Sequence, residues 1–306
     1  MRILITGASG LLGLNLALET AGAHEVYGTA KDHPIQTGAF TVLRSDLLAP
    51  GAVERVLDQV QPDWVIHCAA LANVDACEAD PVLAHQSNTL LPAELAAHVA
   101  RGGARLVHIS TDAVFDGSRG GYREEDEPNP LSVYARTKLE GERTVAQANP
   151  EAIIARVNLF GWSITGRRSL GEFFVSNLQA GRGVMGFTDV LFCPLLANDL
   201  ALIAVSMLEK KLRGLYHIVS RECLSKYDFG VRLARQFGLD ASLITPTSVL
   251  QGGLAARRSP NLTLRTDKLT QALGEPPPDI TSGLERFYEL YQQGYPGQLR
   301  QMAAGG

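Results

Sequence analysis

The sequence lacks the features that mark membrane and nucleic-acid-binding proteins. Its apolar runs stay well short of the roughly 18 residues that a membrane helix needs, and the richest, residues 200–208, has the length of a core helix. The formal net charge is only −4, and the densest basic cluster is Arg257-Arg258 with Arg265 nearby. The sequence therefore lacks the basic stripe that is typical of nucleic-acid-binding proteins. We expect neither a nucleic acid nor a membrane as partner.

Cysteine is also scarce. The four cysteines, at 68, 77, 193 and 223, form no CxxC pair and no cluster with histidine at zinc spacing. The first residues, Met1 to Gly7, already have the pattern of a strand that enters a glycine turn, so we expect no signal peptide. Because disulfides rarely persist in the cytosol, we expect a cytoplasmic protein with four free thiols and no metal.

The first half of the chain alternates short apolar runs with helical patterns. We expect strands at 3–6, 25–30, 39–43, 64–69, 105–110 and 152–157, and helices at 11–21, 51–60, 81–101 and 132–148. This alternation predicts βαβ units, and hence an α/β fold with a Rossmann-type doubly wound parallel sheet. Residues 1–160 would form the dinucleotide-binding domain.

After about residue 160 the pattern loosens and glycines crowd. Short strands are expected at 190–195 and 215–219, and helices at 197–210, 225–237 and 281–293. Residues 161–306 are expected to form a smaller C-terminal α/β substrate lobe, and the chain is allowed to cross back between the two parts. The lobe would cover the edge where parallel strands end, which is where ligands bind in such sheets.

A glycine motif follows the first predicted strand and opens the first helix. Gly7, Gly10 and Gly13 have GxxGxxG spacing. Glycine serves where the backbone turns sharply, approaches a pyrophosphate, or packs a helix on a strand. The helix then offers unpaired N–H groups to phosphates. We therefore expect a dinucleotide.

The end of the second predicted strand suggests which dinucleotide. A carboxylate there usually binds the ribose 2′-OH of NAD, but Thr29 and Ala30 carry none and Lys31 follows. The ammonium of Lys31 would attract a 2′-phosphate, which favours NADP(H), with NAD(H) possible if Asp32 supplies the carboxylate instead.

Two further motifs could carry chemistry. Tyr134 and Lys138 lie four residues apart, on one face of a predicted helix, where an ammonium would lower the pKa of the phenol and prepare it for proton transfer. Thr111 and Asp112 follow a predicted strand; they could bind a carbonyl and sugar hydroxyls, or merely cap a turn.

Together with Cys68-Ala69-Ala70, these motifs resemble the extended short-chain dehydrogenases/reductases. Several stretches resemble the dTDP-4-dehydrorhamnose reductase family within them, and they are most specific between residues 64 and 142: 74–78, 110–117, 134–142 and 214–217. The resemblance implies NADP-dependent reduction of a 4-keto nucleotide sugar.

The resemblance also implies a role for individual residues. The catalytic set would be Thr111, Asp112, Tyr134 and Lys138. The cofactor would be bound by Gly7, Ser9, Gly10, Leu11 and Leu12 at the pyrophosphate, Asp46 and Leu47 at the adenine, and Ala69, Ala70, Leu71 and Asn88 near the active site. Arg257 and Arg258 match a family segment in the substrate lobe, and we expect at least one of them to bind the substrate.

The chain departs from the family pattern in the lobe, at residues 156–161, at Pro194-Leu195 and at 256–260. Two alternatives therefore stay open. One is a nucleotide-sugar epimerase, which uses the same residues. The other is a non-catalytic dinucleotide-binding regulatory subunit that resembles that of methionine adenosyltransferase. The sequence leaves the sugar, the nucleotide, the stereochemistry and the oligomeric state open, a homodimer included.

Overall fold

Seven parallel strands form the central sheet of the chain in a computed structural model, which describes residues 1–31, 35–251 and 259–303. Their order is β11-β6-β5-β4-β1-β2-β3. The strands are β1 (Arg2–Thr6), β2 (Glu25–Ala30), β3 (Thr41–Arg44), β4 (Trp64–His67), β5 (Arg105–Thr111), β6 (Ile153–Val157) and β11 (Gly214–Ile218). The strand order reverses between β1 and β4, so a crevice is expected there.

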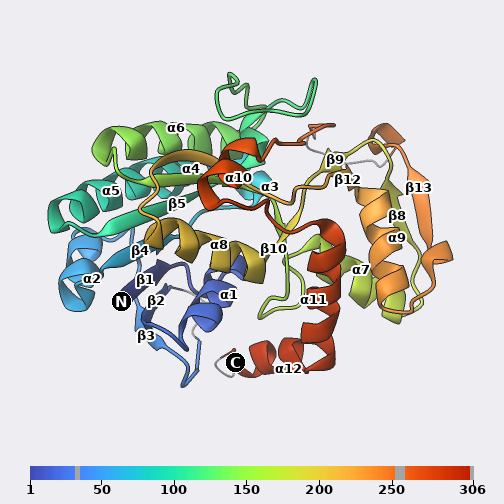
Figure 1. Cartoon of the computed structure of the whole chain (residues 1–306), viewed down its shortest axis with the longest axis horizontal. Coiled ribbons are helices and arrows are strands. Elements are labelled where there is room, and N and C mark those ends of the chain that lie inside the picture. Colours follow the sequence, from blue (N-terminus) through green and yellow to red (C-terminus); the bar gives the residue numbers. More distant parts are fainter. Residues whose placement is uncertain (32–34, 252–258, 304–306) are drawn as a thin grey trace.

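Helices cover both faces of this sheet (Figure 1). On one face lie α2 (Ala52–Val60), α5 (Leu91–Gly102) and α6 (Val133–Ala148), which share a buried apolar cluster with β1, β4, β5 and β6. On the other face α1 (Leu11–Thr20) packs against α8 (Ala197–Glu209). The inner strands are almost wholly buried, which explains their continuous apolar runs, whereas the edge strand β3 is partly exposed. The predicted doubly wound fold is confirmed.

The lobe is built from three two-stranded pairs: β10 (Leu195–Leu196) with β7 (Leu159–Phe160), β12 (Leu224–Ser225) with β9 (Leu191–Phe192), and β13 (Ile244–Thr247) with β8 (Val184–Phe187). Its helices are α7 (Leu170–Gln179), α9 (Lys226–Gln236), α11 (Ile280–Gln292) and α12 (Tyr295–Gln301). The strand expected at 190–195 is in fact β9 and β10, which are separated by Cys193 and Pro194. Proline has no N–H for a ladder, which accounts for the break.

We call the seven-stranded sheet with the helices that cover it the sheet half. Two elements from the C-terminal part of the chain belong to it. Helix α8 packs on α1, and β11 forms the sheet edge beside β6. The remaining short elements are α3 (Val74–Ala79), α4 (Pro81–His85), η1 (Gln86–Leu90), η2 (Asp112–Val114), η3 (Ala241–Leu243), η4 (Val249–Gln251) and α10 (Asp267–Leu273). The chain crosses back into the sheet half, and the division at residue 160 stays a proposal. Among the described residues, no helix is both long and apolar enough to cross a membrane.

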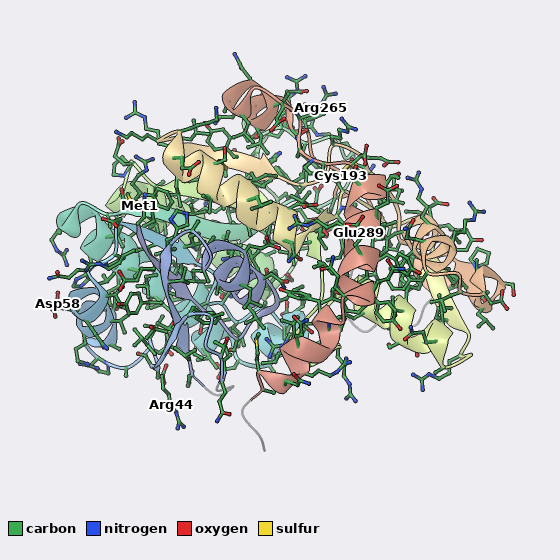
Figure 2. All side chains as sticks on the ribbon, turned by 60° about the horizontal axis from the view of Figure 1, so that its bottom comes forward. Met1, Arg44, Asp58, Cys193, Arg265 and Glu289 are labelled. Atoms are coloured by element: carbon green, nitrogen blue, oxygen red, sulfur yellow. A yellow bond between two sulfur atoms is a disulfide. The ribbon has the colours of Figure 1, made fainter. Side chains whose placement is uncertain are left out.

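The expectation of four free thiols is wrong. Cys193 and Cys223 form a disulfide, whereas Cys68 and Cys77 are free. Phe192 pairs with Leu224 across the antiparallel β9–β12 ladder, so the next residues in register are the two cysteines, with Cα atoms 4.1 Å apart. They are 30 residues apart in sequence, and only the strand pairing brings them together. Figure 2 labels Cys193 in the lobe, close to the label of Glu289 on α11.

Candidate active site

The glycine turn between β1 and α1 has the geometry of a phosphate cradle. Gly7 has a φ of +67°, which favours glycine, and a Cβ on it would lie 2.8 Å from the Cα of Ala69. A Cβ on Gly13 would lie 2.3 Å from the carbonyl oxygen of Gly7. Gly10 caps α1 with no side-chain hydrogen bond, so the first turn of the helix leaves N–H groups for a ligand. These residues fit a dinucleotide pyrophosphate.

A cleft of about 450 Å³ opens over this turn. Most residues predicted to bind the cofactor line it: Gly7, Ser9, Gly10, Lys31, Asp46, Leu47, Ala69, Ala70 and Leu71. Leu11, Leu12 and Asn88 are not among its lining residues. Lys31 forms an ion pair with Asp46, Nζ to Oδ2 3.1 Å, so the two groups assigned to the 2′-phosphate and the adenine lie side by side. Arg168 also lines the cleft, although it belongs to none of the sequence motifs.

Asn88 does not line the cleft but hydrogen-bonds Leu71, a residue that does. Its Oδ1 accepts from the Leu71 N–H at 2.9 Å, and its Nδ2 donates to the Leu71 carbonyl at 3.1 Å and to Thr137 Oγ1 at 3.2 Å. The expected single helix over 81–101 is interrupted here by the π turn η1, which holds Asn88 buried against α6. A Cβ on Gly141 would lie 2.2 Å from the Asn88 carbonyl oxygen, so glycine permits this close approach. The side chain thus fixes the loop at Leu71 to α6.

Thr111 and Asp112 lie where β5 ends. Asp112 is only 4% exposed, and its carboxylate accepts from Asn158 Nδ2 at 2.5 Å and from Thr111 Oγ1 at 3.2 Å. Burial raises the pKa of Asp112 to about 6, although the hydrogen bonds from Asn158 and Thr111 oppose the rise. Asn158 belongs to the stretch that departs from the family pattern, and it directly contacts a predicted catalytic residue.

Tyr134 lies in the first turn of α6, which Ser132 caps by accepting from the Ala135 N–H at 3.2 Å. Burial raises the pKa of Tyr134 to about 12; a hydrogen bond with Thr111 opposes this, while the charge of Asp112 adds to it. The expectation that Lys138 lowers the pKa of this phenol is therefore wrong for the structure. Thr111, Asp112 and Tyr134 do come together at the carboxyl edge of the sheet.

Lys138 faces the backbone of β5. Its Nζ donates to the Ile109 carbonyl at 2.6 Å, and the side chain is 3% exposed. Burial lowers the pKa of Lys138 to about 8, and the nearby charge of Glu142 opposes the shift. Lys138 is not among the groups that shift the pKa of Tyr134.

A buried ion pair behind these residues was not predicted. Arg156 on β6 donates to Glu142 on α6 with Nη2 to Oε2 2.8 Å and Nε to Oε1 3.0 Å, and Ser110 donates to the same carboxylate at 2.5 Å. The three side chains join β5, β6 and α6 under the site. The sequence carried a signal: Arg156 interrupts an otherwise apolar strand, and Glu142 lies one turn after Lys138.

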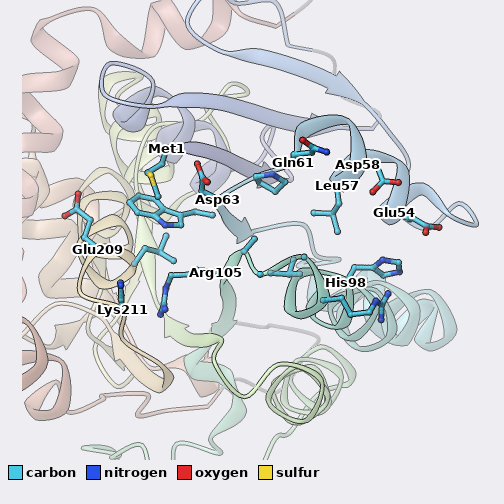
Figure 3. A pocket seen from close by; sticks show the side chains of 18 residues that line it. Met1, Glu54, Leu57, Asp58, Gln61, Asp63, His98, Arg105, Glu209 and Lys211 are labelled. Carbon is cyan, nitrogen blue, oxygen red and sulfur yellow. The ribbon is translucent and has the colours of Figure 1, made fainter.

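Two other predictions lie elsewhere. Arg257 and Arg258 fall outside the described residues. A larger cavity of about 880 Å³ lies at the amino edge of the sheet, lined by residues such as Met1, Asp63 and Arg105 (Figure 3). It is distant from every predicted site residue, because the catalytic side chains follow the carboxyl ends of the strands.

Comparisons with known proteins agree with this geometry. A family model described as the RmlD substrate binding domain matches residues 1–293. A probable low-salt glycan biosynthesis reductase from Haloferax volcanii is 35% identical over 251 residues, which cover 80% of this chain and 83% of that protein. The methionine adenosyltransferase 2 subunit beta of Danio rerio is 33% identical over 277 residues, which cover 88% and 84%.

A solved structure extends the likeness to the fold. The dTDP-4-dehydrorhamnose reductase from Bacillus anthracis, in complex with NADP, superposes with a TM-score of 0.84 at 26% identity, over 94% of this chain and 98% of that one. The family model spans both the sheet half and the lobe. The chain therefore belongs to the RmlD substrate binding domain family, within the extended short-chain dehydrogenases/reductases.

Proposed function

We propose that the chain reduces the keto group of a nucleotide-linked 4-keto sugar with NADPH, as a dTDP-4-dehydrorhamnose reductase does. One observation carries the proposal: Thr111, Asp112 and Tyr134 converge at the carboxyl edge of the sheet, the same edge at which the cleft opens over the glycine cradle. The relatives that are reductases, and the structural neighbour with NADP bound, support it.

When bound, the cofactor supplies the hydride, and the chain has to supply the proton and the positioning. Tyr134 is suited to be the acid, because a phenol with a pKa of about 12 is protonated at neutral pH. Its hydroxyl would donate to the oxygen of the substrate carbonyl. The hydroxyl of Thr111, which is hydrogen-bonded to Tyr134, would orient that oxygen.

A regulatory subunit is the second candidate, since a methionine adenosyltransferase subunit is about as similar to this chain as the reductases are. The presence of Thr111, Tyr134 and Lys138 favours the reductase. An epimerase would use the same residues, but it would keep the cofactor bound and return the hydride to the sugar. It would therefore cause no net oxidation of NADPH.

Loss of NADPH absorbance in the presence of a dTDP-linked 4-keto-6-deoxy sugar tests the proposal. We expect turnover by the wild type, and a kcat lower by about 10²–10⁴-fold in Tyr134→Phe, because only the acid is removed. NADPH affinity, measured by calorimetry, should stay within about twofold, since the hydride donor does not need the phenol to bind.

Two results would contradict the reductase. A wild type that binds NADPH but oxidises none with any 4-keto nucleotide sugar would favour the regulatory subunit. Equal turnover by wild type and Tyr134→Phe would remove the catalytic assignment.

A further inference from the structure

A loop from the lobe reaches back to the glycine turn of the sheet half. Residues 161–169 connect β7 to α7, and Arg168 of this loop donates from Nη1 to the carbonyl oxygen of Ser9 at 2.9 Å. The contact joins residues 159 positions apart. Arg168 thereby becomes a lining residue of the cleft that also contains Gly7 and Gly10.

A buried carboxylate fixes the shape of this loop. Glu172 is 1% exposed, and its oxygens accept from the N–H groups of Ser163 at 2.6 Å, Arg168 at 2.8 Å and Ser169 at 3.2 Å. The hydroxyl of Ser163 donates to the same carboxylate. The backbone of Arg168 is therefore held by a group in the core, so no backbone entropy of this loop has to be lost when its side chain binds a ligand.

The end of the loop is fixed as well. Ser169 caps α7 by accepting from the Glu172 N–H at 3.2 Å, and its hydroxyl donates to the Gly161 carbonyl at 2.7 Å. Both ends of the loop are thus tied to one another and to the helix. The guanidinium is presented from a rigid support, although Arg168 itself is exposed.

The positive charge of Arg168 lies beside the glycine turn, where the pyrophosphate of a dinucleotide is expected to bind. Among the described residues that line the cleft, the cations are Arg168, beside the glycine turn, and Lys31, just after β2. The amino end of α1 already favours a diphosphate through its unpaired N–H groups. A guanidinium has five donors in a planar fork, so one bond to Ser9 leaves others for phosphate oxygens.

We infer that Arg168 binds the pyrophosphate of the dinucleotide, which makes the lobe part of the cofactor site. The inference rests on the proposed function, because it needs a dinucleotide in the cleft. It separates two roles: Arg168 would bind a group common to NADPH and NADH, whereas Lys31 would contact the 2′-phosphate that only NADPH carries. Binding of either dinucleotide would then clamp the lobe onto the sheet half.

Calorimetric titration of wild type, Arg168→Ala and Arg167→Ala with NADPH and NADH tests the inference. We expect Arg168→Ala to weaken both dinucleotides by about tenfold, and by the same factor, because a charge-assisted hydrogen bond to phosphate is lost. Arg167→Ala is the matched control, an exposed neighbour with the same charge that is absent from the cleft lining, and should change either affinity by less than about twofold. Adenosine 2′-monophosphate, which has no pyrophosphate, should bind wild type and Arg168→Ala equally.

The outcomes separate the inference from the proposed function. Equal affinities in Arg168→Ala and wild type would overturn the inference, and so would a loss confined to NADPH and adenosine 2′-monophosphate, which would place the arginine at the 2′-phosphate. An equal loss in Arg167→Ala would also overturn it, since it would reveal only a general effect of charge. A wild type that binds neither dinucleotide would overturn the proposed function itself, and the inference with it.

Discussion

The sheet half and the lobe hold their functional side chains by different means. In the sheet half, Thr111 ends β5, Asp112 follows it, and Tyr134 lies in the first turn of α6. A buried network of Ser110, Glu142 and Arg156 lies beneath them. In the described part of the lobe the strands form two-stranded pairs, and a disulfide and a loop folded around Glu172 hold it together with its helices.

The difference shows how the two halves divide their work. A catalytic constellation has to be held within a fraction of an ångström, and a buried network shared by three elements of the sheet provides that. Small, locally closed units can change without disturbing the sheet, so the lobe can be adapted to a substrate. The expectation that all departures from the family pattern lie in the lobe is wrong, because Arg156 and Val157 belong to β6 of the central sheet. Leu159, Phe160 and Leu195 do lie in a strand pair of the lobe, β7 with β10.

The largest effect should come from breaking the network of the sheet half. Glu142→Ala leaves the guanidinium of Arg156 buried without its partner, and we expect it to lower the free energy of unfolding by about 3–5 kcal/mol. Urea denaturation followed by circular dichroism measures this loss.

An exposed ion pair provides the control. Glu151→Ala removes the pair with Arg213, whose side chains are more than half exposed, and should cost less than about 1 kcal/mol. Similar losses in the two variants would contradict the view that the buried network stabilises the sheet half.

The lobe should respond to reduction instead. Closing a 30-residue loop limits the unfolded chain, so reduction of the Cys193–Cys223 bond should lower the unfolding free energy by about 3.6 kcal/mol. The double variant Cys193→Ser, Cys223→Ser should show the same stability with and without reductant. Alkylation of the unreduced, denatured chain should label two thiols, and labelling of four would mean that the bond is absent.

Asp112 should make the stability of the sheet half depend on pH. Its pKa of about 6 in the folded state lies above the usual 3.8, so the folded chain holds this proton more tightly. The stabilisation is present below pH 3.8 and is lost as the pH rises through 6. Relative to Asp112→Asn, the wild type should lose about 2 kcal/mol of stability between about pH 4.5 and pH 7.5. A stability difference that stays constant over this range would contradict the raised pKa.

The sheet half could largely be predicted from the sequence, because its signals are local. Each strand is a short apolar run, each helix repeats its apolar residues along one face, and Gly7 to Gly13 lie between a strand and a helix. The same locality placed Thr111 at a strand end and Tyr134 in a first helical turn. The π turn at 86–90 was missed, since tertiary contacts of Asn88 override a continuous helical pattern.

The lobe could not be predicted to the same extent, because its contacts join distant residues. Two-residue strands have no detectable periodicity, and the pairing of Cys193 with Cys223 depends on a strand register that no local pattern reveals. Arg168 reaches Ser9 across 159 positions. The predicted direction of the Tyr134 pKa shift was wrong because helical spacing shows that Lys138 lies on the same face but does not show how deeply the folded chain buries the phenol.

The smallest of these effects concerns cofactor choice, and it contrasts Lys31 with Arg168. Lys31 is half exposed and already paired with Asp46, so a 2′-phosphate has to compete with that carboxylate for the ammonium. We therefore expect Lys31→Ala to reduce the preference for NADPH over NADH by only about tenfold, through weaker binding of NADPH alone. Titration of both dinucleotides measures the ratio of their dissociation constants, which Arg168→Ala should leave unchanged while it weakens both. If Lys31→Ala kept the full preference, the group that selects the cofactor would have to lie elsewhere in the cleft. In that case Lys31 would lose its role in selecting the cofactor, while the role of Arg168 in binding both dinucleotides would be unaffected.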